Sequence, residues 1–124
     1  MFSHQVYNVA HIVGIVMLMA ALGGAAVLAM VDAQRTNPRA RRLVAMLHGI
    51  GAFVVLLGGF GMLARLGIAG AGFPPWLWVK LLIWGVLALS LFVLSRRPHT
   101  ARTILIALPI LGGLAAYMAI YKPI

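Results

Sequence analysis

The chain has 124 residues, of which 64% are hydrophobic and 9% are charged, and its mean hydropathy is +1.07. Soluble domains carry about 25% charged residues, so this composition excludes a water-soluble fold and indicates a lipid bilayer as the solvent. Ten Lys and Arg against one acid, Asp32, give a formal charge of +9, but these basic residues cluster between apolar runs, which argues against nucleic-acid binding. With no cysteine, the chain has no disulfide, Cys-ligated zinc or iron–sulfur cluster.

Four apolar runs follow one another, at about 7–31, 43–64, 74–94 and 103–121. Each is about 20 residues long, enough to cross a hydrocarbon core of about 30 Å as a helix. A lone strand would leave backbone groups unpaired in lipid. We therefore predict an all-α integral membrane protein, an antiparallel four-helix transmembrane bundle. The connections are too short for a soluble domain, so residues 1–124 are expected to form a single transmembrane domain.

The first run begins with polar residues on one helical face. His4 and Tyr7 precede His11 by seven and four residues, a spacing that places all three on one side of a helix. At about 1.5 Å per residue, His11 lies about 6 Å into this span. Residues 1–8 contain no Lys or Arg, and the run is too long for a signal-peptide core. We expect the segment to be retained as a membrane span.

The second run contains a histidine near its start and an arginine at its end. About 24 Å of helix rise separates the level of His48 from that of His11, so one haem cannot be ligated by both. We interpret His48 as a hydrogen-bonding residue between helices, with Asp32 as a candidate partner, and a haem ligand is the alternative. Arg65 ends the run at the membrane side where His11 is expected. Gly58 and Gly61 share one face and predict close helix packing.

The third run holds a charge inside an apolar span. Lys80 lies about 9 Å into this helix by residue count. Trp76 and Trp84 precede and follow it by four residues on the same face, as a cation–π arrangement or a wall for a flat ring. Three explanations for Lys80 remain open. It snorkels to the headgroups, it donates to backbone carbonyls of residues 109–113, or it binds an external anion or carbonyl such as a haem propionate, a quinone oxygen or a lipid phosphate.

The fourth run contains Pro109, which predicts a kink, and ends in two tyrosines at the level of Lys80. The only acid, Asp32, is expected at the opposite side of the membrane. The cations at this level therefore have no carboxylate of this chain to pair with. The candidate cofactor site gathers residues from all four runs: His11, Arg65, Trp76, Lys80 and Tyr117.

The connections at about 32–42 and 96–102 are rich in arginine, whereas the other connection and the tails hold few basic residues. Both arginine-rich connections fall on one side of a four-span chain. Because loops with excess Lys and Arg stay in the cytoplasm, we expect them to face the cytoplasm of a bacterial inner membrane. Both termini are then expected to point outward.

This arrangement resembles a group of small bacterial four-span membrane proteins: the HemJ-type protoporphyrinogen oxidases, the SirB-like proteins and the CopD-like domains. The resemblance covers the layout of the whole chain. HemJ-type proteins place a His on the first helix and a Lys on the third and bind haem b. The resemblance implies that His11 is an axial haem ligand and Lys80 its functional partner. HemJ-type proteins have a second His two residues before the Lys, where this chain has Trp78. The matching segments are AHIVGIV, PRARRLVAML, WLWVKLLIW and YKPI.

The sequence contains no nucleophile–base arrangement, paired carboxylates, Walker loop or HExxH motif, and it leaves open whether the protein is an enzyme. Two functions are open. The first is binding of haem b or a similar flat ligand at the His, Lys and Trp cluster, with a redox or porphyrin-related role. The second is a structural or accessory membrane subunit that packs through glycine-rich faces, by self-association or in a larger membrane complex. The lipid bilayer is the expected surrounding in both.

Overall fold

The computed structural model describes residues 3–31, 36–66 and 74–121, with the side chains of residues 65 and 66 left out. These residues form four long helices and no strand. Each long helix is apolar enough to cross a membrane, which confirms the predicted all-α four-helix membrane bundle. The helices are α1 (His4–Met30), α2 (Pro38–Leu66), α3 (Pro75–Arg96) and α4 (Ala101–Tyr121), with the short 3-10 turn η2 (Pro98–Thr100) before α4.

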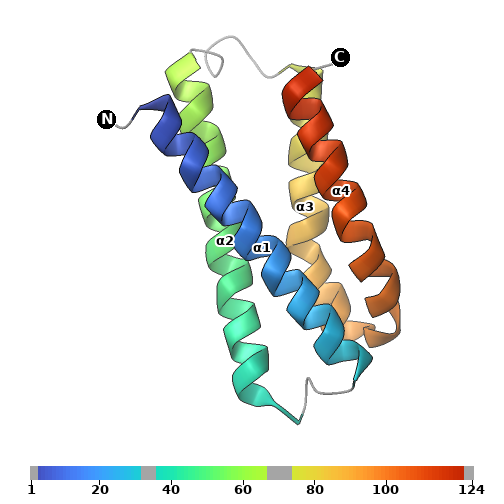
Figure 1. Cartoon of the computed structure of the whole chain (residues 1–124). Helices are drawn as coiled ribbons and strands as arrows, with labels where there is room; N and C mark the ends of the chain where they lie inside the picture. The colour runs from blue at the N-terminus through green and yellow to red at the C-terminus, as the bar shows by residue number, and fades with distance from the viewer. Residues whose placement is uncertain (1–2, 32–35, 67–73, 122–124) are drawn as a thin grey trace.

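The four helices alternate in direction (Figure 1), as an antiparallel bundle requires. The first turn of α1 and the last turn of α4 lie at one end, which we call the terminal end. The first turn of α2 and the turn between α3 and α4 lie at the other end, which we call the arginine end. The arginine end carries Arg39, Arg41, Arg42, Arg96, Arg97 and Arg102.

Local capping explains where the helices begin. The Ser3 hydroxyl accepts a hydrogen bond from the Val6 N–H at 3.3 Å and caps α1. The Asn37 side-chain oxygen accepts from the Ala40 N–H at 3.1 Å, and Pro38 occupies the first helical position of α2. Therefore α2 begins before the apolar run predicted from 43, because the cap rather than hydropathy sets its start.

The helices α1 and α2 pack with backbone against backbone. A Cβ atom added to Gly58 would lie 2.6 Å from the backbone nitrogen of His11, and one added to Gly14 would lie 2.7 Å from the backbone nitrogen of Val55. A Cβ on Gly61 would overlap the ring of Tyr7. In lipid, such close approach replaces the hydrophobic effect as the source of helix association, because it increases dispersion contact. The packing role predicted for Gly58 and Gly61 is confirmed.

The best-packed part of the bundle lies toward the arginine end. Leu22, Ala26 and Leu94 have an exposed fraction of 0% there, and Ala101 at the start of α4 has 1%. Alanines recur along this part of α1, so neighbouring helices approach it closely. We call this part, whose core also includes Ala25 and Ala29, the closed half. Pro109 is exposed within α4, and the kink predicted for it stays a prediction.

Candidate functional site

The half of the bundle nearer the terminal end contains a cavity of about 580 Å³. Side chains of all four helices line it, and most are apolar. Ligand pockets in proteins have volumes of about 300–1,000 Å³ and are apolar with a few polar groups that orient the ligand. We call this cavity the ring cavity, and the part of the bundle around it the open half. The polar and titratable residues that line it are His4, Asn8, His11 and Lys80, together with the indole rings of Trp76 and Trp84.

His11 is held in one orientation by α2. Its Nδ1 atom lies 2.7 Å from the backbone oxygen of Val55. A carbonyl oxygen only accepts, so Nδ1 carries the hydrogen and Nε2 keeps a lone pair. The approach depends on glycine, because α1 lies against Gly58 at this level and the imidazole lies beside Gly59. Among the described residues Nε2 has no hydrogen-bond partner, which leaves it as the atom that His11 offers to a ligand.

This geometry is the one that metal-ligating histidines usually show. Such a histidine donates its second ring N–H to a carboxylate, a backbone carbonyl or water, which fixes the tautomer and raises the basicity of the ligating nitrogen. His11 meets this condition through Val55. The same lone pair also accepts a hydrogen bond from a hydroxyl group, as on a reduced quinone. Within the described residues no group of three or more His, Cys, Asp or Glu is placed to hold a bare metal ion.

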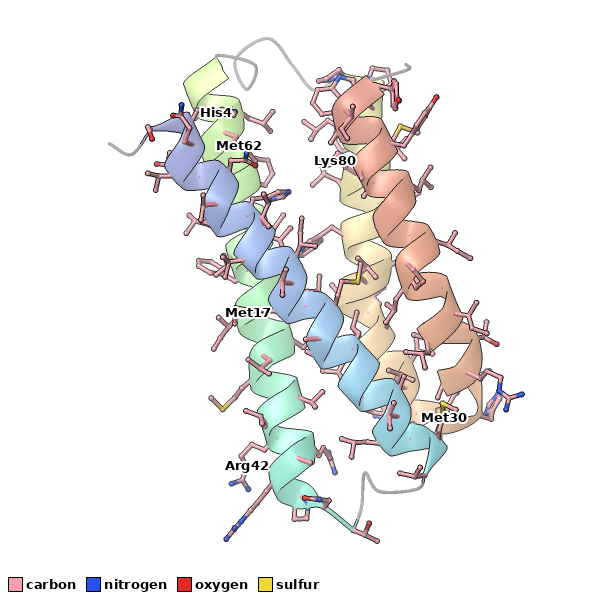
Figure 2. All side chains as sticks on the ribbon, in the orientation of Figure 1. His4, Met17, Met30, Arg42, Met62 and Lys80 are labelled. Carbon is pink, nitrogen blue, oxygen red and sulfur yellow. The ribbon has the colours of Figure 1, made fainter. Side chains whose placement is uncertain are left out.

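The α3 wall of the ring cavity contains the predicted Trp–Lys–Trp stripe. Trp76, Lys80 and Trp84 all line the cavity. Figure 2 shows Lys80 in the terminal half of α3, across the bundle from His4 and Met62. The two tryptophans differ in role, because the Trp84 indole N–H donates to the Ala52 carbonyl at 3.1 Å. Trp84 therefore joins α3 to α2, whereas Trp76 lies nearer the terminal end.

The floor of the ring cavity is closed by hydrogen bonds in both directions between α2 and α3. The Nε2 atom of buried His48 lies 3.2 Å from the Leu87 carbonyl oxygen, and Trp84 bonds back to Ala52. Since a carbonyl accepts, His48 donates from Nε2. The predicted hydrogen bond of His48 between helices is confirmed, with a backbone carbonyl as the acceptor. Asp32, the candidate partner, lies outside the described residues.

Apart from Ile120, the α4 residues that line the ring cavity are small, which the sequence analysis did not anticipate. They recur at helical spacing, so one face of α4 leaves room rather than filling it. The signal was present in the sequence as the segment GGLAAYMA, whose small residues follow a period of three and four. The cavity-lining members of this face are Gly112, Ala115, Ala116 and Ala119.

Two predicted site residues are placed differently from the others. Tyr117 is 47% exposed, and its ring packs against Tyr121 with 5.0 Å between ring centroids. It lies at the expected level of the membrane, but it is not among the residues that line the ring cavity. Arg65 lies in the last turn of α2, and its side chain is outside the part of the chain that the structure describes. The structure thus brings His11, Trp76 and Lys80 to one cavity.

Comparison of the chain with known protein families, with curated proteins and with solved structures found no match. What the site does is therefore argued from its own geometry. The ring cavity combines an oriented imidazole with a lone pair, an ammonium group, indole rings and a wall of small side chains. This set suits a flat, mainly apolar molecule with a polar or acidic edge.

Proposed function

We propose that this multi-pass membrane protein binds a flat ring ligand in the ring cavity, haem b or a related porphyrin or quinone, in a redox or porphyrin-related role. The observation that carries the proposal is the fixed orientation of the His11 imidazole beside the ring cavity. Its Nδ1–H is fixed on the Val55 carbonyl, so its Nε2 lone pair is available in a cavity of about 580 Å³.

The residues present fit haem b. His11 would supply a proximal imidazole of the kind that holds haem iron in many proteins. The Lys80 ammonium would pair with a propionate, and the resemblance to HemJ-type proteins points to the same two residues. Trp76 would contact the edge or face of the ring, and the small residues of α4 would leave space beside it. Arg65 ends α2 at the same end and is proposed as a second cation toward the propionates. When bound, haem supplies one-electron redox chemistry, which this chain would tune through the His11–Val55 hydrogen bond.

Absorption spectra of the purified protein test the haem proposal. We expect a Soret band, either as purified or after addition of haem, and we expect the His11→Ala variant to lose or shift it. The matched control is His99→Ala, because His99 is an exposed histidine in η2 at the arginine end. Absence of a Soret band with added haem would exclude haem. An unchanged band in His11→Ala would exclude His11 as the ligand.

A quinone is tested separately through the tryptophans. Trp76 and Trp84 line the ring cavity, so a ring bound there should quench their fluorescence. Titration with a short-chain quinone should give saturable quenching that weakens in Lys80→Met. Absence of saturable quenching by either the quinone or haem would overturn the proposal of a ring ligand as a whole.

The second candidate function is a structural or accessory subunit, which one observation favours. At four glycines within the helices, Gly23, Gly49, Gly85 and Gly113, an added Cβ would meet no atom within 4 Å beyond the neighbouring residues and backbone of its own helix. Outward glycines suit close contact with another membrane helix, of a second copy or of a larger complex. Size measurement in detergent and lipid tests this role. A monomer whose size is unchanged by Gly49→Leu would contradict self-association through that face.

We propose the bacterial inner membrane as the location, with the arginine end in the cytoplasm and both termini outward. The support is the uneven distribution of arginines between the two ends. A reporter that is active only in the cytoplasm, fused after Ile124, should be inactive. An active reporter would overturn the orientation.

A further inference from the structure

A second cavity, of about 440 Å³, lies at the arginine end, between the last turn of α1 and the turn that joins α3 to α4. It shares no lining residue with the ring cavity, and it plays no part in the proposed function. We call it the turn pocket. Its lining residues are Ala29, Met30, Pro98, His99, Ala101 and Arg102.

The turn pocket has an apolar base and a polar rim. Ala29 and Ala101 are buried at 5% and 1% exposure and form part of the base. His99 and Arg102 are exposed and supply the polar groups. The turn that carries His99 is fixed, because the Arg97 carbonyl accepts from both the N–H and the hydroxyl of Thr100, at 3.0 and 2.7 Å. The rim is therefore held in place by short-range bonds.

The surroundings of the turn pocket are positively charged. Arg96 and Arg97 directly precede η2, and the Arg96 guanidinium lies 5.2 Å from the centroid of the Phe92 ring, which orients it along α3. Figure 2 shows Arg42 of α2 at this same end, across the bundle from Met30 of the pocket. None of the residues in 3–31, 36–66 and 74–121 is acidic, so the described part of the chain offers these cations no carboxylate.

We propose that the turn pocket binds a phosphate group of the kind carried by anionic phospholipid headgroups. The pocket lies where α1 and α3 end and α4 begins, the level at which headgroups meet a spanning helix. The Arg102 guanidinium donates to the phosphate oxygens, and His99 donates a second bond, since arginine presents a fork of donors that matches phosphate. Met30 and Pro98 contact the apolar part of the lipid below the phosphate. Basic pockets between membrane helices are a recurring type of lipid site.

Native mass spectrometry of the full chain tests the proposal, after reconstitution in phosphatidylglycerol and, in parallel, in phosphatidylcholine. We expect phosphatidylglycerol to be retained in preference to phosphatidylcholine. Arg102→Gln should lower the retained fraction by more than about fivefold, because it removes the donors to the phosphate as well as one charge at an anionic lipid surface. Arg102→Lys should restore only part of it, because lysine keeps the charge but lacks the fork of donors. Arg41→Gln is the matched control, because it removes one exposed charge from the same end outside the pocket, and it should lower retention by no more than about fivefold, the effect of surface charge alone.

A further measurement distinguishes a lipid phosphate from a soluble phosphate as the ligand. Inorganic phosphate at matched ionic strength should not displace phosphatidylglycerol if the lipid is the ligand. Displacement that depends on Arg102 would support the same phosphate site with a soluble anion as its occupant. Equal losses in Arg102→Gln and Arg41→Gln, or no loss in Arg102→Gln, would overturn the proposal. Arg102 is exposed, so its substitution should leave folding intact, and an unchanged helical circular dichroism spectrum checks this.

Discussion

The closed half and the open half of the bundle consist of the same four helices, yet only one is filled. In the closed half Leu22, Ala26 and Leu94 are fully buried. In the open half the same helices enclose the ring cavity of about 580 Å³, and the titratable residues His11 and Lys80 line it. Between helices in lipid there is no hydrophobic driving force, so a half that is not filled gains less dispersion energy. Packing in the open half therefore contributes less to the free energy of unfolding than packing in the closed half.

Specific contacts between helices border the open half. Glycine contacts between α1 and α2 run up to the level of His11, so this helix pair stays closed along the cavity. At the floor, the bonds of His48 and Trp84 hold α2 to α3. The comparison teaches that the titratable residues His11 and Lys80 lie where the helices leave space between them.

The largest expected effect is the loss of a closed-half side chain. Leu94→Ala should lower the free energy of unfolding by about 2–5 kcal/mol, because the fully buried leucine leaves a void that its neighbours fill only in part. Unfolding in mixed detergent, followed by circular dichroism, measures the change. The control is Leu82→Ala on the same helix, where the side chain is 69% exposed, and the change should stay below about 0.5 kcal/mol. Equal effects would mean that the closed half is not the stabilising part.

The same enlargement should affect stability in the closed half and leave it almost unchanged in the open half. Ala25→Leu in the closed half should lower the free energy of unfolding by about 1–3 kcal/mol through overpacking. Ala115→Leu on the α4 wall should change it by less than about 0.5 kcal/mol, because the added atoms enter the cavity. Ala115→Leu should also weaken the binding of any ligand that occupies this space. Thermal melts in detergent provide the measurement, and destabilisation by Ala115→Leu equal to that by Ala25→Leu would show that the open half is filled.

The glycine contact between α1 and α2 is tested by adding one methyl group. Gly58→Ala should lower the free energy of unfolding by about 1–3 kcal/mol, because the new Cβ meets backbone atoms of α1, which cannot move aside alone. The control is Gly49→Ala on the same helix, where the Cβ meets nothing within 4 Å. It should raise stability by up to about 1 kcal/mol, since alanine favours a helix over glycine. Two changes of the same sign would contradict backbone packing at Gly58.

The sequence was sufficient for the fold because run length and hydropathy determine the number of spans. Depth was also readable, because residue number gives the level along antiparallel helices, and His11 and Lys80 indeed line one cavity. Rotation about the helix axis was not readable for α4. Tyr117 has the right level, but the face toward the cavity is the one with Gly112, Ala115 and Ala119. The acceptor of the His48 bond was also hidden, since any backbone carbonyl accepts and none is marked by its side chain.

The smallest expected effect lies at the boundary between the two halves. His48→Leu removes the donor to the Leu87 carbonyl, and side-chain hydrogen bonds within a bilayer contribute about 0.6 kcal/mol on average. The loss should be of this size, because the Leu87 carbonyl keeps its bond within α3. The matched control, His99→Leu, changes an exposed histidine and should leave stability unchanged. Weaker closure of the floor should also expose Trp84 one turn away, which its fluorescence emission would report as a red shift. A stability loss without that shift would mean that His48 supports the closed half alone and does not form the floor of the ring cavity.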